Sequence, residues 1–178
     1  MVLVNKWKDA SVEVLNEVID EAFQELGYSK AKQEQKEAVR SILEGQDLFI
    51  SFPTGFGKSA VFQVLPTCAS LLIKATSSDY SLSRLPCVLV VSPLISLTAD
   101  QAIKLHDRKF KAVARLSEEA PETTFQDLLS GKVTHILASP EALLFTKWRK
   151  LLLEPKFVDN IVAVAVDEAH CIMKWYVY

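Results

Sequence analysis

Two short stretches of the sequence combine residue types that bind phosphate and metal ions. The first, "PTGFGKS", places Gly55 and Gly57 directly before Lys58 and Ser59. Glycines permit positive φ angles, at which successive backbone N–H groups turn around an anion. Lys58 would then reach the phosphates of a nucleotide, and the Ser59 hydroxyl would bind Mg²⁺. Taken alone, the stretch also suits a tight strand-to-helix turn with an exposed lysine. The strict phosphate-loop pattern fails, because Phe52 stands where it requires glycine.

The second stretch, "DEAH", directly follows the apolar run "IVAVAV". Asp167 at the end of such a strand can hold Mg²⁺ directly or through water. Glu168 would face the attacking water, as a general base or as a group that positions it. The alternative is that both carboxylates simply begin a solvated loop. On the residues alone, His170 is better explained as structural than as catalytic, and His106 and His135 have no motif around them.

The elements expected around these stretches alternate between helix and strand. Apolar spacing predicts helices over 11–26, over 32–43, from 58 onward with an interruption or kink at Pro66, and over 96–106. Apolar runs predict strands over 47–52, 87–92, 111–116, 134–139 and 161–166. Such an alternation indicates an α/β fold with a mostly parallel sheet between helices. Ligands bind at the carboxyl ends of parallel strands, so both stretches are expected to converge on one triphosphate–magnesium unit.

Length, charge and cysteine content narrow the class of protein. The 178 residues amount to one domain or most of one. The net charge of −2 means that any nucleic-acid binding must come from local groups. The three cysteines lack zinc-ligand spacing and are expected to be reduced thiols. The stretch "MVLVNKWKDA" lacks the apolar run and small-residue cleavage site typical of a signal peptide, and no run approaches the ~20 apolar residues of a membrane span. We therefore expect a soluble intracellular protein with no membrane partner.

Five stretches, in order along the chain, resemble motifs of the RecQ family of superfamily 2 DNA helicases. "LGYSKAKQEQKEAV" (26–39) resembles the adenine-recognition motif. "PTGFGKS" has this superfamily's form of the phosphate loop, which dispenses with the first glycine. "VVSPLISLTADQ" (90–101), "ASPEAL" (138–143) and "AVDEAHCIMKW" (165–175) resemble motifs Ia, Ib and II. The resemblance covers about residues 23–175 and implies the first RecA-like, P-loop NTPase domain of such a helicase.

The resemblance implies a nucleotide site. Gln35 would bind adenine through its side-chain amide, which donates and accepts at once. Lys32 stands where the family usually has arginine, so adenine binding would be weaker. The implied ATP-binding residues are Tyr28, Lys32, Gln35, Thr54, Gly55, Phe56, Gly57, Lys58 and Ser59, with Mg²⁺ at Ser59 and Asp167. The implied catalytic residues are Lys58, Asp167, Glu168 and His170, the last coupling hydrolysis to DNA contact.

The resemblance also implies contacts to nucleic-acid phosphates that position a strand without reading its sequence. The implied residues are Ser92, Ser96, Gln101, Ser139 and Trp175. Helix capping and turn formation are the alternative for the serines, because Ser92 and Ser139 each precede a proline.

The domain plan implied is an N-terminal helical extension over 1–25 and an incomplete helicase ATP-binding domain over 26–178. The motif III strand and the second RecA-like domain with its arginine finger are expected to be absent. Without that strand, the two strands that carry the site would face an empty slot or collapse together. Without the second domain, this part is expected to bind ATP but to be unable to unwind DNA alone.

The function implied is an ATP-binding and nucleic-acid-binding fragment of an ATP-dependent 3′-to-5′ DNA helicase, with ATP and Mg²⁺ as cofactors. Its partner would be single-stranded or forked DNA. Family analogy suggests roles in DNA repair and recombination, in the nucleus if the source is eukaryotic and in the cytoplasm otherwise. Two alternatives stay open: a fragment of an RNA helicase of the same superfamily, and a truncated non-catalytic module that binds without turnover.

Overall fold

Helices α1 and α2 form at the places that apolar spacing predicts. The computed structural model describes residues 7, 10–28, 30–76, 84–93, 99, 101–103, 105 and 113–171. Helix α1 (Val12–Glu25) begins after Ser11, whose hydroxyl oxygen accepts a hydrogen bond from the N–H of Val14 at 3.3 Å. Helix α2 (Gln33–Leu43) follows a seven-residue connection that includes Tyr28. Both helices bury one apolar face, which confirms the predictions over 11–26 and 32–43.

Helix α3 (Lys58–Thr76) is the core helix of the structure. It continues through Pro66, so the interruption predicted there does not occur. A proline inside a helix costs about 3 kcal/mol or more. That cost is offset because the helix buries side chains on several sides, among them Val64, Leu65 and Leu72. By length and hydropathy α3 resembles a membrane span, but it packs against α1, α2 and the sheet, so a position in the core explains its apolar character.

Four strands form an all-parallel sheet in the order β2-β3-β1-β4. They are β1 (Cys87–Val91), β2 (Val113–Leu116), β3 (His135–Ala138) and β4 (Ile161–Val166). Val90 of β1 lies opposite Leu137 on one side and Ala165 on the other. Four of the five predicted strands are therefore confirmed, and so is their parallel arrangement.

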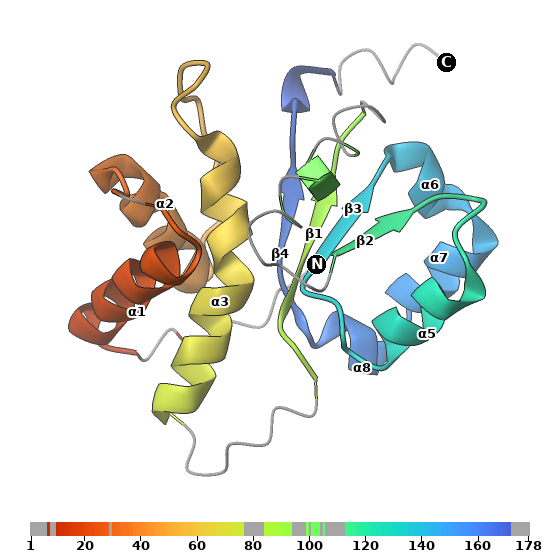
Figure 1. Cartoon of the computed structure of the whole chain (residues 1–178), viewed down its shortest axis with the longest axis horizontal. Coiled ribbons are helices and arrows are strands. Elements are labelled where there is room, and N and C mark those ends of the chain that lie inside the picture. Colours follow the sequence, from red (N-terminus) through yellow and green to blue (C-terminus); the bar gives the residue numbers. More distant parts are fainter. Residues whose placement is uncertain are drawn as a thin grey trace.

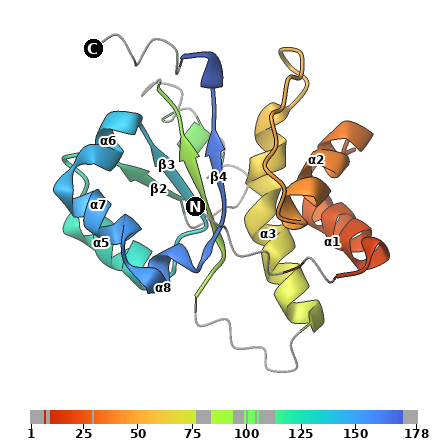
Figure 2. The same ribbon diagram turned by 180° about the vertical axis from the view of Figure 1, so that it is seen from behind.

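Helices cover both faces of the sheet, as Figures 1 and 2 show. Val88 and Val90 of β1 face the layer of α1–α3, whereas Cys87 and Leu89 face the opposite layer. The opposite layer contains α5 (Glu122–Leu129), α6 (Pro140–Leu144), α7 (Thr146–Leu152) and α8 (Pro155–Val158). Because successive side chains of a strand point to opposite faces, a strand buried on both sides must be apolar throughout. This is why continuous apolar runs, with no alternation of polar residues, predicted these strands correctly.

The predicted strand over 47–52 does not form. These residues lack strand structure, and no backbone hydrogen bond joins them to β4 among the residues that the structure describes. Ile50 and Phe52 pack against the core of α1–α3, but Leu48 and Phe49 are exposed. A strand requires a neighbouring edge with which to pair its N–H and C=O groups. Within the described ranges β4 pairs only with β1, so the two segments neither pair nor collapse onto each other.

Candidate functional site

The glycine loop leads into α3 with both of its glycines at positive φ. The φ angle is +80° at Gly55 and +91° at Gly57, so the chain adopts the conformation for which glycine was expected. Helix α3 begins at Lys58, so the N–H groups of its first turn adjoin the loop, and that of Ala60 donates to the Gly57 carbonyl at 3.0 Å. The Lys58 amine donates to the carbonyl of Phe52 at 2.8 Å and to that of Pro53 at 3.5 Å. A phosphate bound here would replace the two carbonyls as the hydrogen-bond partner of this amine.

The Gln35 side chain joins α2 to the loop. Its amide Nε2 donates to the carbonyls of Phe56 at 3.2 Å and Gly57 at 3.0 Å, and its Oε1 accepts from the N–H of Lys32 at 2.9 Å. A Cβ added at Gly57 would lie 2.7 Å from this Nε2, so the close approach requires glycine. Both ends of the amide are thus occupied within the protein. An adenine would have to compete with these partners for Gln35.

Lys32 and Phe56 form a second link between the start of α2 and the loop. The Lys32 amine lies 3.7 Å from the centroid of the Phe56 ring and also donates to the Phe56 carbonyl at 3.3 Å. The Phe56 ring lies 4.5 Å from that of Phe52. Thr54 is exposed in the loop, whereas Ser59 is half-buried in the first turn of α3. The aromatic ring in the loop is therefore held by a cation and a second ring.

Tyr28 lies in the connection between α1 and α2, and its side chain contacts α1 and α3. Its hydroxyl donates to Oε1 of Gln63 in α3 at 2.5 Å, and its ring meets that of Phe23 edge to face at 5.4 Å between centroids. The contact fixes the start of the segment 26–39 against α3. A role near a bound base remains a prediction.

The acidic residues follow β4, as the sequence predicted. The N–H of Asp167 still donates to Val91 of β1 at 2.9 Å, after which the chain turns through Glu168 at a φ of +53°. One oxygen of the Asp167 carboxylate, Oδ1, accepts from the N–H of Glu168 at 3.0 Å. The Glu168 carboxylate lies 3.2 Å from Nδ1 of His170, and His170 in turn lies 3.5 Å from the Cys171 sulfur.

The second oxygen of Asp167 is held by Gln101. Oδ2 accepts from Nε2 of Gln101 at 2.8 Å, and Gln101 is almost fully buried. The other end of this amide, Oε1, has no partner among the described residues. The structure thus brings together a residue predicted to contact nucleic acid and a residue predicted to bind metal. The two are 66 positions apart in the sequence, which is why the contact had no local signal.

The remaining residues predicted to contact nucleic acid have different surroundings. Ser139 caps α6, with its hydroxyl oxygen accepting from the N–H of Ala142 at 3.2 Å. Ser92 is fully buried after β1, and its hydroxyl has no partner among the described residues. Ser96 and Trp175 lie outside the described residues. For Ser139, capping accounts for the side chain without a ligand.

The loop and the acidic residues lie at the same end of the structure, where α3 begins and β4 ends (Figures 1 and 2). No hydrogen bond or ion pair connects them in the part of the chain that the structure describes. Over the same part, no three Asp, Glu, His or Cys side chains gather closely enough to hold a metal ion by themselves. This donor set suits Mg²⁺ that arrives with nucleotide phosphates, which needs only one or two carboxylates from the protein. The half-buried Asp167 carboxylate keeps lone pairs free beyond its two hydrogen bonds.

One family model and several known proteins are similar to this sequence. The family model described as "DEAD/DEAH box helicase" matches residues 32–178. The chain belongs to the DEAD/DEAH box helicase family. This helicase sequence is 32% identical over 145 residues to the ATP-dependent helicase SGS1 of Saccharomyces cerevisiae, with 79% of the chain aligned. It is 31% identical over 152 residues to the ATP-dependent DNA helicase RecQ of Haemophilus influenzae, and 34% over 155 residues to the probable ATP-dependent DNA helicase RecS of Bacillus subtilis.

These relatives confirm the resemblance to RecQ-type helicases. The alignments cover 84% of the chain with the Haemophilus protein and 86% with the Bacillus protein. The helicase chain spans 9%, 22% and 27% of the lengths of the SGS1, RecQ and RecS proteins, respectively. The parallel sheet between helices is consistent with a RecA-like helicase domain.

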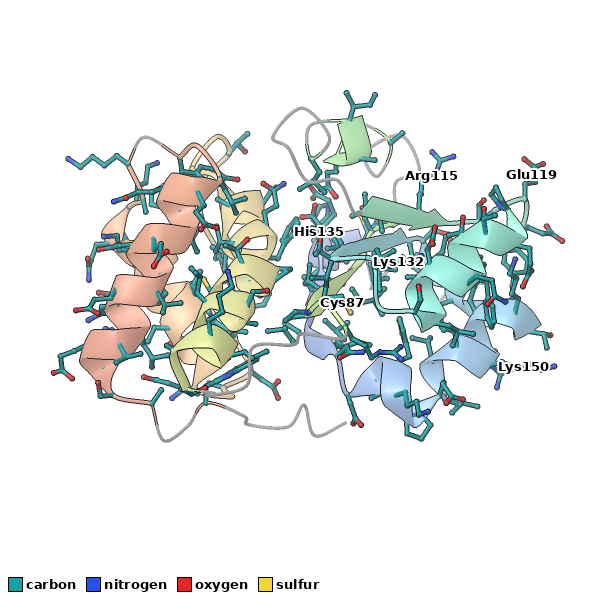
Figure 3. The ribbon with its side chains drawn as sticks, turned by 60° about the horizontal axis from the view of Figure 1, so that its bottom comes forward. Cys87, Arg115, Glu119, Lys132, His135 and Lys150 are labelled. Atoms are coloured by element: carbon teal, nitrogen blue, oxygen red, sulfur yellow. The ribbon has the colours of Figure 1, made fainter. Side chains whose placement is uncertain are left out.

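Sequence patterns missed a buried polar network behind the site of this helicase domain. His135 lies on β3 where the sheet faces α3 (Figure 3). Its Nε2 is 3.0 Å from the carbonyl of Gln63, and its Nδ1 is 2.9 Å from the hydroxyl of Thr134. Burial lowers the pKa of His135 from 6.5 to about 4, against the opposing effect of the bond to Gln63. Because Gln63 also accepts from Tyr28, the network runs from the adenine-recognition stretch through α3 to the sheet.

Proposed function

We propose that residues 26–178 form the ATP-binding part of a RecQ-type, ATP-dependent DNA helicase. The observation that carries the proposal is the common location of the glycine loop at the start of α3 and of Asp167 and Glu168 after β4. A nucleotide triphosphate needs both: N–H groups and an amine for its oxygens, and carboxylates for its metal ion and for water. The family match and the helicase names of the relatives support the same reading.

In this proposal each polar residue of the candidate site has a specific role. Lys58 exchanges its bond to the Phe52 carbonyl for phosphate oxygens. Asp167 and the Ser59 hydroxyl hold Mg²⁺, which supplies positive charge against the phosphates when it is bound. Gln101 keeps the Asp167 carboxylate in one orientation. Glu168, held beside His170, positions the attacking water.

The proposal extends to the DNA partner and to the direction of movement. The names of the Haemophilus and Bacillus relatives specify DNA, which favours DNA over RNA as the nucleic acid of this chain. We further propose that the preferred nucleic acid is single-stranded or forked DNA and that the direction of movement is 3′-to-5′. Unwinding would require a second motor domain, and the protein would act in repair or recombination. A eukaryotic source would place such a protein in the nucleus.

Binding of ATP tests the core of the proposal. Isothermal titration calorimetry in the presence of Mg²⁺ would compare the unaltered chain with Lys58→Ala and Lys74→Ala. Lys74 is the matched control, because it is an exposed lysine in the last turn of the same helix. Loss of a hydrogen bond to a charged group costs about 1.5–3 kcal/mol, so Lys58→Ala should weaken binding about 10- to 100-fold. Equal affinities in all three proteins would contradict the proposal.

Nucleic-acid stimulation separates the alternatives. Because the proposal includes a requirement for a second motor domain, ATP hydrolysis would be measured in a form of the protein that includes such a domain, with single-stranded DNA, with single-stranded RNA and with neither. Greater stimulation by DNA supports the proposal, and greater stimulation by RNA points to an RNA helicase. ATP binding without hydrolysis under any of these conditions would point to a non-catalytic module.

A further inference from the structure

We propose that Phe56 is a positioning residue of the phosphate loop, and that its contact with Lys32 holds the loop in the conformation that binds nucleotide phosphates. The inference rests on the proposed ATP site and adds a residue that the glycines and the lysine of the loop do not explain. It also gives Lys32 a structural role that is separate from contact with the adenine base.

The Lys32–Phe56 contact joins two segments that are 24 positions apart in the chain. The ammonium group of Lys32 lies over the ring face at 3.7 Å from its centroid. The same group donates to the main-chain carbonyl of Phe56 at 3.3 Å, so it holds both the side chain and the backbone of this residue. The Phe52 ring lies 4.5 Å from that of Phe56.

The other side chains that hold the loop, those of Gln35 and Lys58, contact its backbone carbonyls. Thr54 and Gly55 are exposed, and a Cβ added at Gly55 would meet no atom within 4 Å. A loop with two glycines loses more conformational freedom on ordering than other sequences, so a contact that restricts it in advance favours binding. Phe56 is the loop side chain in a position to supply that restriction, because Gln35 reaches only the backbone carbonyls of Phe56 and Gly57.

The chemistry of the contact indicates which substitutions preserve it. A cation over an aromatic ring is attracted by the negative face of the ring, and arginine makes this interaction as well as lysine does. Lys32→Arg should therefore keep the contact. Lys32→Met keeps the length of the side chain but removes the charge, and Phe56→Leu keeps apolar volume but removes the ring face.

A double-mutant cycle tests the coupling of the two residues. Affinities for ATP and for inorganic tripolyphosphate would be measured by calorimetry in the unaltered chain, Lys32→Met, Phe56→Leu, the double variant and Lys32→Arg. We expect each disrupting single change to weaken both ligands by about three- to tenfold, the double variant to be no weaker than either single one, and Lys32→Arg to bind normally. Tripolyphosphate matters because it lacks a base, so its affinity reports on the loop alone.

Amide hydrogen exchange provides a readout that needs no ligand. Exchange at residues 54–57 should be faster in Lys32→Met and in Phe56→Leu, to the same extent, while the urea midpoints of unfolding stay at that of the unaltered chain. Additive losses of affinity, or a loss for ATP alone, would overturn the inference and leave Lys32 as a base-contact residue. If the unaltered chain bound neither ligand, the proposed function would fail, whereas unchanged exchange in both variants would refute the Lys32–Phe56 coupling independently.

Discussion

Mild acid should destabilise this domain through His135. The side chain is fully buried between β3 and α3, and its two ring nitrogens meet Gln63 and Thr134. The Gln63 carbonyl can only accept, so Nε2 donates to it, and in the neutral ring Nδ1 accepts from the Thr134 hydroxyl. A proton added to His135 would leave a buried charge opposite a hydroxyl oxygen.

The pKa values give the sign and the size of the effect. Below about pH 6.5 the unfolded chain binds a proton at this histidine, whereas the folded protein does so only near its lowered pKa of about 4. The contribution of His135 to stability is therefore fully present above the unfolded value and is lost as the pH falls toward the folded one. At 1.36 kcal/mol per pKa unit, the whole difference corresponds to about 3 kcal/mol, of which about 2 kcal/mol is lost by pH 5.

Urea unfolding at about pH 7 and about pH 5 measures this loss. The test variant is His135→Gln, whose amide nitrogen can still donate to the Gln63 carbonyl and does not titrate. The control is His170→Gln, which removes a histidine that is largely exposed. The informative quantity is the difference between the three proteins in the free energy lost between the two pH values.

His135→Gln should lose about 2 kcal/mol less free energy of unfolding between the two pH values than the unaltered chain does. His170→Gln should lose as much as the unaltered chain. If His135→Gln and the unaltered chain lost equal amounts, the protonation of a buried His135 would not be the cause, and the assigned network would be wrong.

Two further predictions concern the site. Gly57→Ala should weaken ATP binding about tenfold or more, because the added Cβ would lie 2.7 Å from Gln35 and the positive φ would cost about 1–3 kcal/mol of backbone strain. Gly55→Ala has the same backbone strain, but its Cβ would enter open space. It should therefore weaken binding less in the same calorimetric measurement. Gln101→Leu should weaken Mg²⁺-dependent ATP binding about 10- to 100-fold by releasing the Asp167 carboxylate. Titration of ATP with and without Mg²⁺ tests this, since an equal loss in both conditions would exclude an effect through the metal carboxylate.

Much of the fold followed from local patterns. The helices over α1 and α2 and the four strands of the sheet form where apolar spacing predicts them. The segment 47–52 had an equally apolar pattern, yet it is irregular, because a strand exists only where another edge pairs with it. Pro66 was expected to interrupt or kink α3; burial of the surrounding side chains keeps the helix uninterrupted.

The candidate site, like the fold, was predicted only in part from the sequence. The positive φ angles of Gly55 and Gly57, and the location of Asp167 directly after an apolar strand, agree with what the two motifs indicate. The partners of the polar side chains did not follow from the motifs. Gln35 donates to loop carbonyls, and Gln101 holds Asp167 although it was expected to contact a nucleic-acid phosphate.

The order of amino acids alone was enough to identify the chemical groups of a nucleotide site, because glycine conformation, apolar runs and the functional groups of side chains are local properties. Three-dimensional packing assigned each polar group its partner: Lys32 to Phe56, Gln101 to Asp167, and His135 to Gln63. These pairs are separated by 24, 66 and 72 positions. A hydrogen bond requires about 3 Å between donor and acceptor, and only the packing of helices against the sheet brings residues so far apart in the chain to that distance.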